Sequence, residues 1–296
     1  MNKQLKGSAY LLLATVFWGS TFVAQDAAME FVEPFTFMVM RSLLGAAVLL
    51  PVILILDKKN GKRFWDGWAD PKLWKAGILC AIPLFFAANL QQLGIGEGTE
   101  SGKAGFLTSM YILFVPLIGI FRKEKAPKLL PVSLILAVAG LYFLSFKKGE
   151  RINPGDLLIL CCAATYAFQI TVVDKYVNQV DAVRLNTIQI LLAGLITLIP
   201  MFLMETPTVS AIGNCWLPIL YAGVLSSGVA FTLQIVGQKD LPPSLASLIM
   251  SFEAVFALLT GLIFGEQISP PKIWGSCLIF AAVLLCQLPI PLRKKK

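Results

Sequence analysis

Two ionisable side chains stand inside long apolar segments of the sequence. Glu253 lies in the segment 242–264, roughly 16 Å from its start at the helical rise of 1.5 Å per residue, and Arg41 lies roughly 10 Å into 34–56. A charge at such depth in a bilayer normally faces a cavity or a partner. Glu253 could carry a coupling proton, meet a substrate ammonium, or be a neutral acid that ties helices together. Arg41 could bind a substrate carboxylate, pair with Glu253, or extend to the nearer membrane surface.

Uncharged polar and aromatic side chains occur in similar apolar segments. The candidates are Trp18, Asn89, Gln92, Tyr111, Tyr166, Gln169 and Gln234. Trp and Tyr join an apolar ring to a polar tip, and an amide can both donate and accept. We expect these residues and Glu253 to line a substrate-binding cavity, although any single one could instead make an interhelical hydrogen bond.

Other kinds of chemistry are excluded by composition. The sequence has no histidine, which excludes histidine metal ligands, Ser-His and Cys-His catalytic sets and histidine proton relays. The glycines of 94–105 lack the Gly-Lys-Ser/Thr of a phosphate-binding loop, so ATP is not expected to drive the protein. Glu253 is the only clear acid in the middle of an apolar segment. We therefore expect no enzyme activity, no metal and no cofactor.

The elements that must position these residues are membrane-spanning helices. Hydrophobic residues make up 57% of the chain and charged residues 14%, against about a quarter charged in soluble domains. The 296 residues accommodate about ten spans of roughly 20 residues. They are predicted at 7–25, 34–56, 73–95, 102–121, 129–146, 157–176, 182–204, 215–236, 242–264 and 270–290, with a kink at Pro116 in the fourth. Little sequence remains for a soluble domain, so residues 1–296 are predicted to form a single all-α membrane domain.

The same pattern is written twice. Aligning 88–146 with 230–288 places Gln92 on Gln234 and Tyr111 on Glu253, and aligning 12–50 with 160–198 matches the two beginnings. We predict two five-helix repeats, at 7–146 and 157–290. Because five is odd, the second repeat must enter the membrane inverted, which is a common design of secondary transporters.

The charge distribution predicts the orientation. Most of the 25 Lys and Arg residues fall on the side of the N-terminus, including the terminal Arg293–Lys296, although Lys147, Lys148 and Arg151 oppose the trend. By the positive-inside rule both termini are cytoplasmic in a multi-pass protein of the cell membrane. The net charge of +8 is thereby explained without nucleic acid as a partner.

Short motifs resemble those of a known family. They are Phe17-Trp-Gly-Ser-Thr-Phe-Val-Ala24, Pro34 through Arg41 with the following Leu-Leu-Gly-Ala, Gly105-Phe-Leu-Thr-Ser109, and Ser251-Phe-Glu-Ala-Val-Phe-Ala257. In order and spacing the chain resembles the EamA family of the drug/metabolite transporter superfamily. The resemblance implies ten helices in two inverted repeats, a central cavity lined mainly by helices one, three, four, six, eight and nine, and efflux of amino acids, other small metabolites or toxic amphiphiles. The family's Glu-Pro pair reads Tyr111-Ile112 in the first copy and Glu253-Ala254 in the second, so the acid occurs only once.

These observations predict a secondary transporter that works by alternating access. It would export small metabolites, amino acids or related amphiphilic compounds, across the cytoplasmic membrane, either coupled to protons or not. The expected partners are a small-molecule substrate and the lipid bilayer, and a monomer is sufficient. A non-transport membrane protein or a lipid flippase of the same fold is the alternative.

Overall fold

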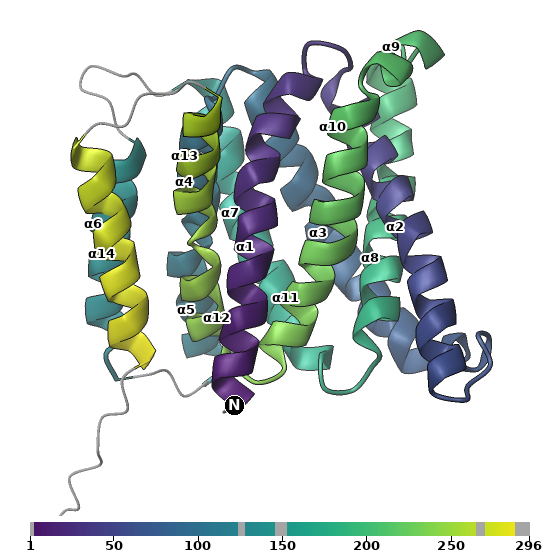
Figure 1. The fold of residues 1–296 in the computed structure, drawn as a ribbon, viewed down its shortest axis with the longest axis horizontal. Helices are drawn as coiled ribbons and strands as arrows, with labels where there is room; N and C mark the ends of the chain where they lie inside the picture. The colour runs from purple at the N-terminus through teal and green to yellow at the C-terminus, as the bar shows by residue number, and fades with distance from the viewer. Residues whose placement is uncertain (1–2, 124–127, 146–152, 265–269, 288–296) are drawn as a thin grey trace, which may run out of the picture.

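The computed structural model describes residues 3–123, 128–145, 153–264 and 270–287, and in these residues every regular element is a helix. The helices run up and down in one bundle (Figure 1). The face on which α1 begins is called the N-terminal face below, and the other is the opposite face. The terminal basic residues and the cluster at 147–151, both used for the predicted orientation, lie outside the described residues.

Eight helical segments in the described chain are long and apolar enough to cross a membrane. They are α1 (Lys3–Ala28), α2 (Pro34–Lys59), α3 (Pro71–Gly96), the pair α4 (Ser101–Ser109) and α5 (Tyr111–Phe121), α7 (Pro154–Tyr176), α8 (Ala182–Met204), the run α10 (Trp216–Tyr221), η2 (Ala222–Ala230) and α11 (Phe231–Gln238), and the pair α12 (Pro243–Met250) and α13 (Glu253–Ile263). Two further helices, α6 (Leu130–Ser145) and α14 (Pro270–Gln287), have shorter apolar parts. The multi-pass, all-helical prediction is confirmed, and the count of ten spans stays a prediction.

Local sequence explains where several helices begin. Prolines stand in the first turn of α2, α3, α7 and α12, where their missing N–H has no intrahelical role. Asp70 and Asp181 accept a backbone N–H at the starts of α3 and α8. Asn153 and Asp156 cap each other's backbone at the start of α7.

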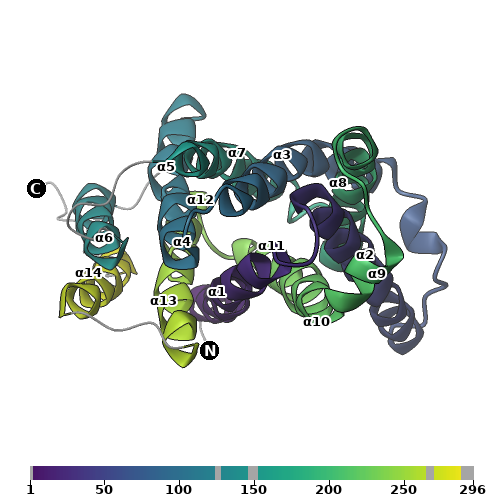
Figure 2. The same cartoon turned by 90° about the horizontal axis from the view of Figure 1, so that it is seen from above.

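Helices from the two halves of the chain interleave. α3 packs against α7 and α8, and α2 packs along α8. α6 and α14 pack together at one end of the bundle, where Gly140 meets the backbone of Gly275 (Figure 2). Small residues at these crossings allow close backbone approach, as is common between membrane helices.

Two of the long segments are broken near their middle. The first breaks at Met110, between α4 and α5, and the second at Ser251 and Phe252, between α12 and α13. Pro116 lies inside α5, so the predicted kink at Pro116 is replaced by a break at Met110, nearly two turns earlier. Proline is not the cause of these breaks, because the second segment has Leu258 at the aligned position and breaks in the same way.

η2 is a π-helical stretch, in which Phe231 N–H bonds to the carbonyl of Ser226 five residues back. π-helical turns are rare and are frequently found at functional sites. Two backbone carbonyls of η2 accept hydrogen bonds from a side chain of α8. Asn186 Nδ2 donates to the carbonyls of Ser227 and Gly228, each at 3.0 Å.

Candidate functional site

A small polar cavity lies where the two halves meet. Its volume is about 40 Å³, and it is lined by residues of α1, α2, α3, the two broken segments, α7, η2 and α11. The lining consists of Trp18, Phe22, Gln25, Arg41, Gln91, Thr108, Tyr111, Tyr166, Gln169, Ile170, Ser226, Phe231, Gln234, Met250 and Glu253. This volume suffices for water but is far below the roughly 300–1,000 Å³ of small-molecule sites. In this conformation the cavity is therefore too small to hold a metabolite.

Glu253 begins α13 directly after the helix break. Its side chain is buried and accepts a hydrogen bond from Ser109 Oγ to Oε1 at 3.3 Å, from the other broken segment. The first turn of a helix carries unpaired N–H groups and the positive end of the helix dipole, which favours an acid there. The break thus places Glu253 in the cavity and gives it a suitable electrostatic environment.

Arg41 is buried on α2 and is held by neutral groups. Its guanidinium donates to Gln25 Oε1 at 3.0 Å, to Ser226 Oγ at 2.6 Å and to Ser227 Oγ at 3.2 Å. The ring of Phe37 lies 5.8 Å from it. Within the part of the chain that the structure describes, Arg41 and Glu253 line the same cavity and form no ion pair with each other. A cation and an acid therefore face the cavity without neutralising each other directly.

A directed chain of amides supports one wall. Gln234 Nε2 donates to Gln169 Oε1 at 3.0 Å, Gln169 Nε2 donates to Gln189 Oε1 at 3.2 Å, and Gln189 Nε2 donates to Asn186 Oδ1 at 3.0 Å. The chain ends at the η2 carbonyls described above. Each amide orientation is fixed by the next, so Gln234 presents its acceptor oxygen, Oε1, without a partner among the described residues. Trp18 Nε1 is likewise a buried donor without a partner in this part of the chain.

The cavity brings together most of the sequence-predicted site residues. Trp18, Arg41, Tyr111, Tyr166, Gln169, Gln234 and Glu253 line it, and Asn89 and Gln92 do not. Asn89 lies in an adjoining space of about 20 Å³ and donates to Thr197 Oγ1 at 2.9 Å. Gln92 donates to the carbonyl of Gln25 at 3.2 Å and to Met29 Sδ.

Several lining residues escaped the sequence argument. Gln91, next to Gln92, is the α3 amide that faces the cavity, and it bonds to Gln25 and Thr108. Gln25 was at the end of a predicted span, but α1 continues to Ala28 and places it inside the bundle. Ser226 of η2 is identified as a lining residue only by its place in the fold, where its hydroxyl accepts a hydrogen bond from Arg41.

Polar contacts close the bundle beyond the cavity on both faces. At the opposite face Lys103 Nζ lies 2.8 Å from Asp156 Oδ2, with both side chains buried, and Glu205 accepts the N–H groups of Phe35 and Thr36 at 2.7 Å. At the N-terminal face Arg184 pairs with Asp57, again with both side chains buried. A wider hollow of about 440 Å³ lies at the opposite face, with Glu30, Glu33 and Glu97 in its lining.

Comparison with known proteins identifies relatives over nearly the whole chain. The model of the EamA-like transporter family matches twice, over residues 5–146 and 153–287. An uncharacterized transporter of Archaeoglobus fulgidus is 29% identical over 290 residues, covering 97% of this chain and 88% of that protein. The uncharacterized transporter YwfM of Bacillus subtilis is 27% identical over 293 residues, covering 95% and 94%.

A solved structure, described only as a crystal structure of a protein, superposes with a TM-score of 0.77 at 18% identity and covers 95% of this chain and 96% of its own. It shows that this fold occurs elsewhere. The family matches, the apolar helices and the transporter names of the relatives agree with the resemblance seen in the sequence motifs. The chain belongs to the EamA-like transporter family.

Proposed function

We propose that the protein is a secondary transporter that exports small zwitterionic or amphiphilic metabolites, such as amino acids, across the cytoplasmic membrane by alternating access. The observation that carries this proposal is the closed cavity that holds both Glu253 and Arg41. Contacts close the bundle on both faces, as expected of an intermediate between inward-open and outward-open states.

Ten spans in two inverted repeats are part of the proposal. The aligned elements support it: α4 and α5 begin at Ser101 and Tyr111, and their counterparts α12 and α13 begin at the aligned Pro243 and Glu253. The family model also matches each half separately. The two repeats, 7–146 and 157–290, would then form the single domain 1–296.

Two glycine contacts support the inversion. A Cβ on Gly94 of α3 would lie 2.4 Å from Ile159 and 2.6 Å from the carbonyl of Gly155, on α7. A Cβ on Gly237 of α11 would lie 2.8 Å from Leu11 and 2.9 Å from the carbonyl of Gly7, on α1. In the alignment of 12–50 with 160–198, extended backward, Gly7 and Leu11 fall on Gly155 and Ile159, so the same crossing is made twice with the halves exchanged.

The unpaired groups of the cavity support a substrate with both charges. Arg41 suits a carboxylate and Glu253 suits an ammonium, while Trp18 Nε1, a donor, and Gln234 Oε1, an acceptor, are among the further polar atoms of the lining. A simple organic cation would require Arg41 to point away from the site, and Arg41 lines it. Because the closed cavity is small, the site must widen when either face opens.

Glu253 is the proposed proton-coupling group. It is a buried acid on one of the broken helices and is the acid of the cavity lining. The proposed location is the cell membrane, with both termini in the cytoplasm. This orientation rests on the positive-inside bias of the sequence.

The test is solute flux in proteoliposomes under imposed pH gradients, with a solute selected by thermal shift from amino acids, nucleosides and quaternary amines. We expect Glu253→Gln to abolish the pH dependence and to lower the flux about tenfold, or about 1.4 kcal/mol. Ser251→Ala, in the same broken segment but hydrogen-bonded to the carbonyl of Leu248, is the matched control and should keep the pH dependence. If Glu253→Gln leaves the pH dependence unchanged, Glu253 is not the coupling group. If no solute moves in the wild type, the non-transport or flippase alternative is favoured.

A further inference from the structure

The connection between α2 and α3 differs sharply from its counterpart in the second half. Residues 58–75 carry six basic side chains, Lys58, Lys59, Lys62, Arg63, Lys72 and Lys75, against two acids, Asp66 and Asp70. They also carry three tryptophans. The corresponding connection after α8 with the first residues of α10, 205–220, has no Lys or Arg and one tryptophan, Trp216. Duplication of the fold therefore does not account for this composition.

Most side chains of this connection are exposed. All six basic side chains are exposed and none pairs with an acid among the described residues. Trp65 is 75% exposed and Trp74 is 42% exposed. The short helix η1 (Asp66–Trp68) lies at the rim of the bundle, at the end away from α6 and α14 (Figure 2).

Helix length places this segment at the headgroup level. α2 and α3 each have 26 residues, or about 39 Å of helix, against a hydrocarbon thickness of about 30 Å. The excess carries the flanking lysines into the interface. Exposed Trp beside clustered Lys and Arg suits an anionic leaflet, because indole rings favour the interface and the basic groups favour acidic headgroups.

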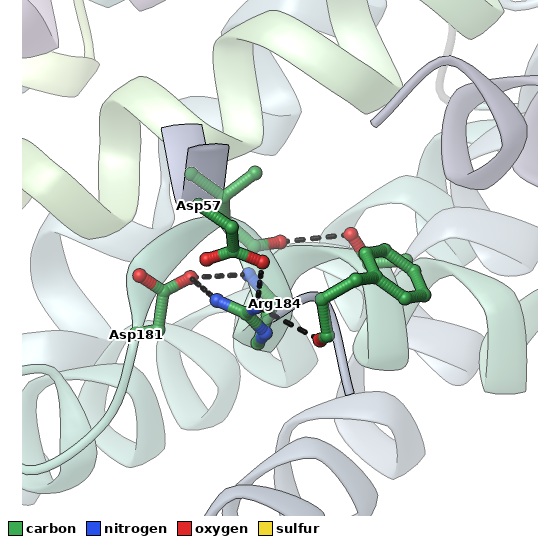
Figure 3. A network of polar contacts seen from close by, with 6 residues as sticks. Asp57, Asp181 and Arg184 are labelled. Carbon is green, nitrogen blue, oxygen red and sulfur yellow. Dashed lines mark hydrogen bonds and ion pairs between the residues drawn. The ribbon is translucent and has the colours of Figure 1, made fainter. Parts of the chain in front are cut away.

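The inner side of the same segment holds Arg184, the residue that closes the N-terminal face. Arg184 Nη2 pairs with Asp57 of α2 and donates to the carbonyl of Phe64 at 3.3 Å, and Asp57 and Asp181 both point toward it (Figure 3). The ring of Trp68 lies 5.5 Å from the guanidinium. Gly67 is pressed against it, since a Cβ there would lie 2.3 Å from Arg184 Cζ. The conformation of residues 64–68 is therefore coupled to the contact between Asp57 of α2 and Arg184 of α8.

We propose that residues 58–75 form a binding surface for anionic phospholipid, and that lipid bound there stabilises the Arg184–Asp57 contact and hence the closed N-terminal face. The exposed lysines and Trp65 contact the lipid. Bound lipid orders residues 64–68. The contacts that Phe64, Gly67 and Trp68 make with Arg184 then hold the Arg184 side chain against Asp57. The surface is independent of the cavity residues and of any particular substrate.

The test uses the full chain in nanodiscs of phosphatidylcholine, with and without phosphatidylglycerol, and measures hydrogen exchange of residues 64–68 and of the first turn of α8. We expect slower exchange in both segments when phosphatidylglycerol is present. The quadruple variant Lys62→Gln/Arg63→Gln/Lys72→Gln/Lys75→Gln should lose most of this protection. Lys3→Gln/Lys6→Gln/Lys175→Gln/Lys239→Gln removes the same number of charges at the same face but outside the segment; it is the matched control and should keep the protection.

Further arms separate the possible sources of the effect. Brominated phosphatidylglycerol should quench wild-type tryptophan fluorescence more than it quenches Trp65→Phe. Equal protection of the wild type and the quadruple variant would overturn the proposal. So would equal protection by inorganic phosphate in pure phosphatidylcholine, which would indicate a free-anion site.

Discussion

The two broken segments, α4–α5 and α12–α13, share a backbone and differ in chemistry. Both break at aligned residues, and the residue that begins the second piece is Tyr111 in one and Glu253 in the other. Both line the cavity. The helix break is therefore duplicated, while the carboxyl group occurs in one copy only.

The serines before the breaks show the same division. Ser109 Oγ donates to Glu253 of the other broken segment, whereas the aligned Ser251 Oγ donates to the carbonyl of Leu248 in its own segment at 2.7 Å. Ser109 therefore contacts an acid of the candidate site, whereas Ser251 bonds to the backbone of its own segment. Similar sequence and similar backbone thus do not imply a similar role.

The largest expected effect concerns the packing of the second break. Gly19 of α1 meets it so closely that a Cβ would lie 2.6 Å from the Glu253 carbonyl and 2.7 Å from Ala257 N. Gly19→Ala should destabilise the protein by about 1–3 kcal/mol, because backbone atoms cannot yield as a side chain can. Thermal unfolding in detergent measures this. Gly102→Ala on α4 is the matched control, with open space around the added methyl, and it should not lower the unfolding temperature. Equal loss in both variants would remove the packing argument.

An intermediate effect is expected from the two serines. Ser109→Ala should lower the solute flux roughly fivefold, because it removes the hydrogen bond to Glu253. This corresponds to a loss of about 1 kcal/mol of free energy. Ser251→Ala should leave flux unchanged. Initial rates at matched protein density in proteoliposomes measure both. A flux defect in Ser251→Ala as large as that in Ser109→Ala would contradict the division of roles.

The smallest effect is expected at Pro116. Pro116→Ala should leave the break at Met110, because α12 and α13 are separated in the same way with Leu258 at the aligned position. Transport and unfolding temperature should not fall. The structure of the variant checks this, and a continuous helix from Ser101 to Phe121 would show that the proline does maintain the first break.

The sequence predicted the helices and most of the cavity because burial of polar residues in apolar segments has few physical solutions. Glu253, Arg41 and Gln169 could be chosen for that reason alone. Whether a given amide points into the cavity depends on helix rotation, which periodicity in a uniformly apolar segment does not reveal.

Gln92 illustrates that limit. The gapless alignment places it on Gln234, but Gly94 and Gly237 make equivalent contacts and are one residue out of that alignment. By this register the structural counterpart of Gln234 is Gln91, which does line the cavity. The cause is η2, whose hydrogen bonds close one residue farther than those of an α-helix, so that the helix gains a residue relative to α3. The helix propensities of Ala222–Ala230 do not predict a π-helical turn.

η2 also bears on the direction of the cycle. Two perfectly matched halves would give inward-open and outward-open conformers of equal free energy, with no resting preference. The wider turn in only one half, fastened by Asn186 and joined to Arg41 through its serines, removes that degeneracy. Under the proposed alternating access, the protein without substrate is then expected to rest predominantly with one face open, and the main chain rather than the substrate sets this preference.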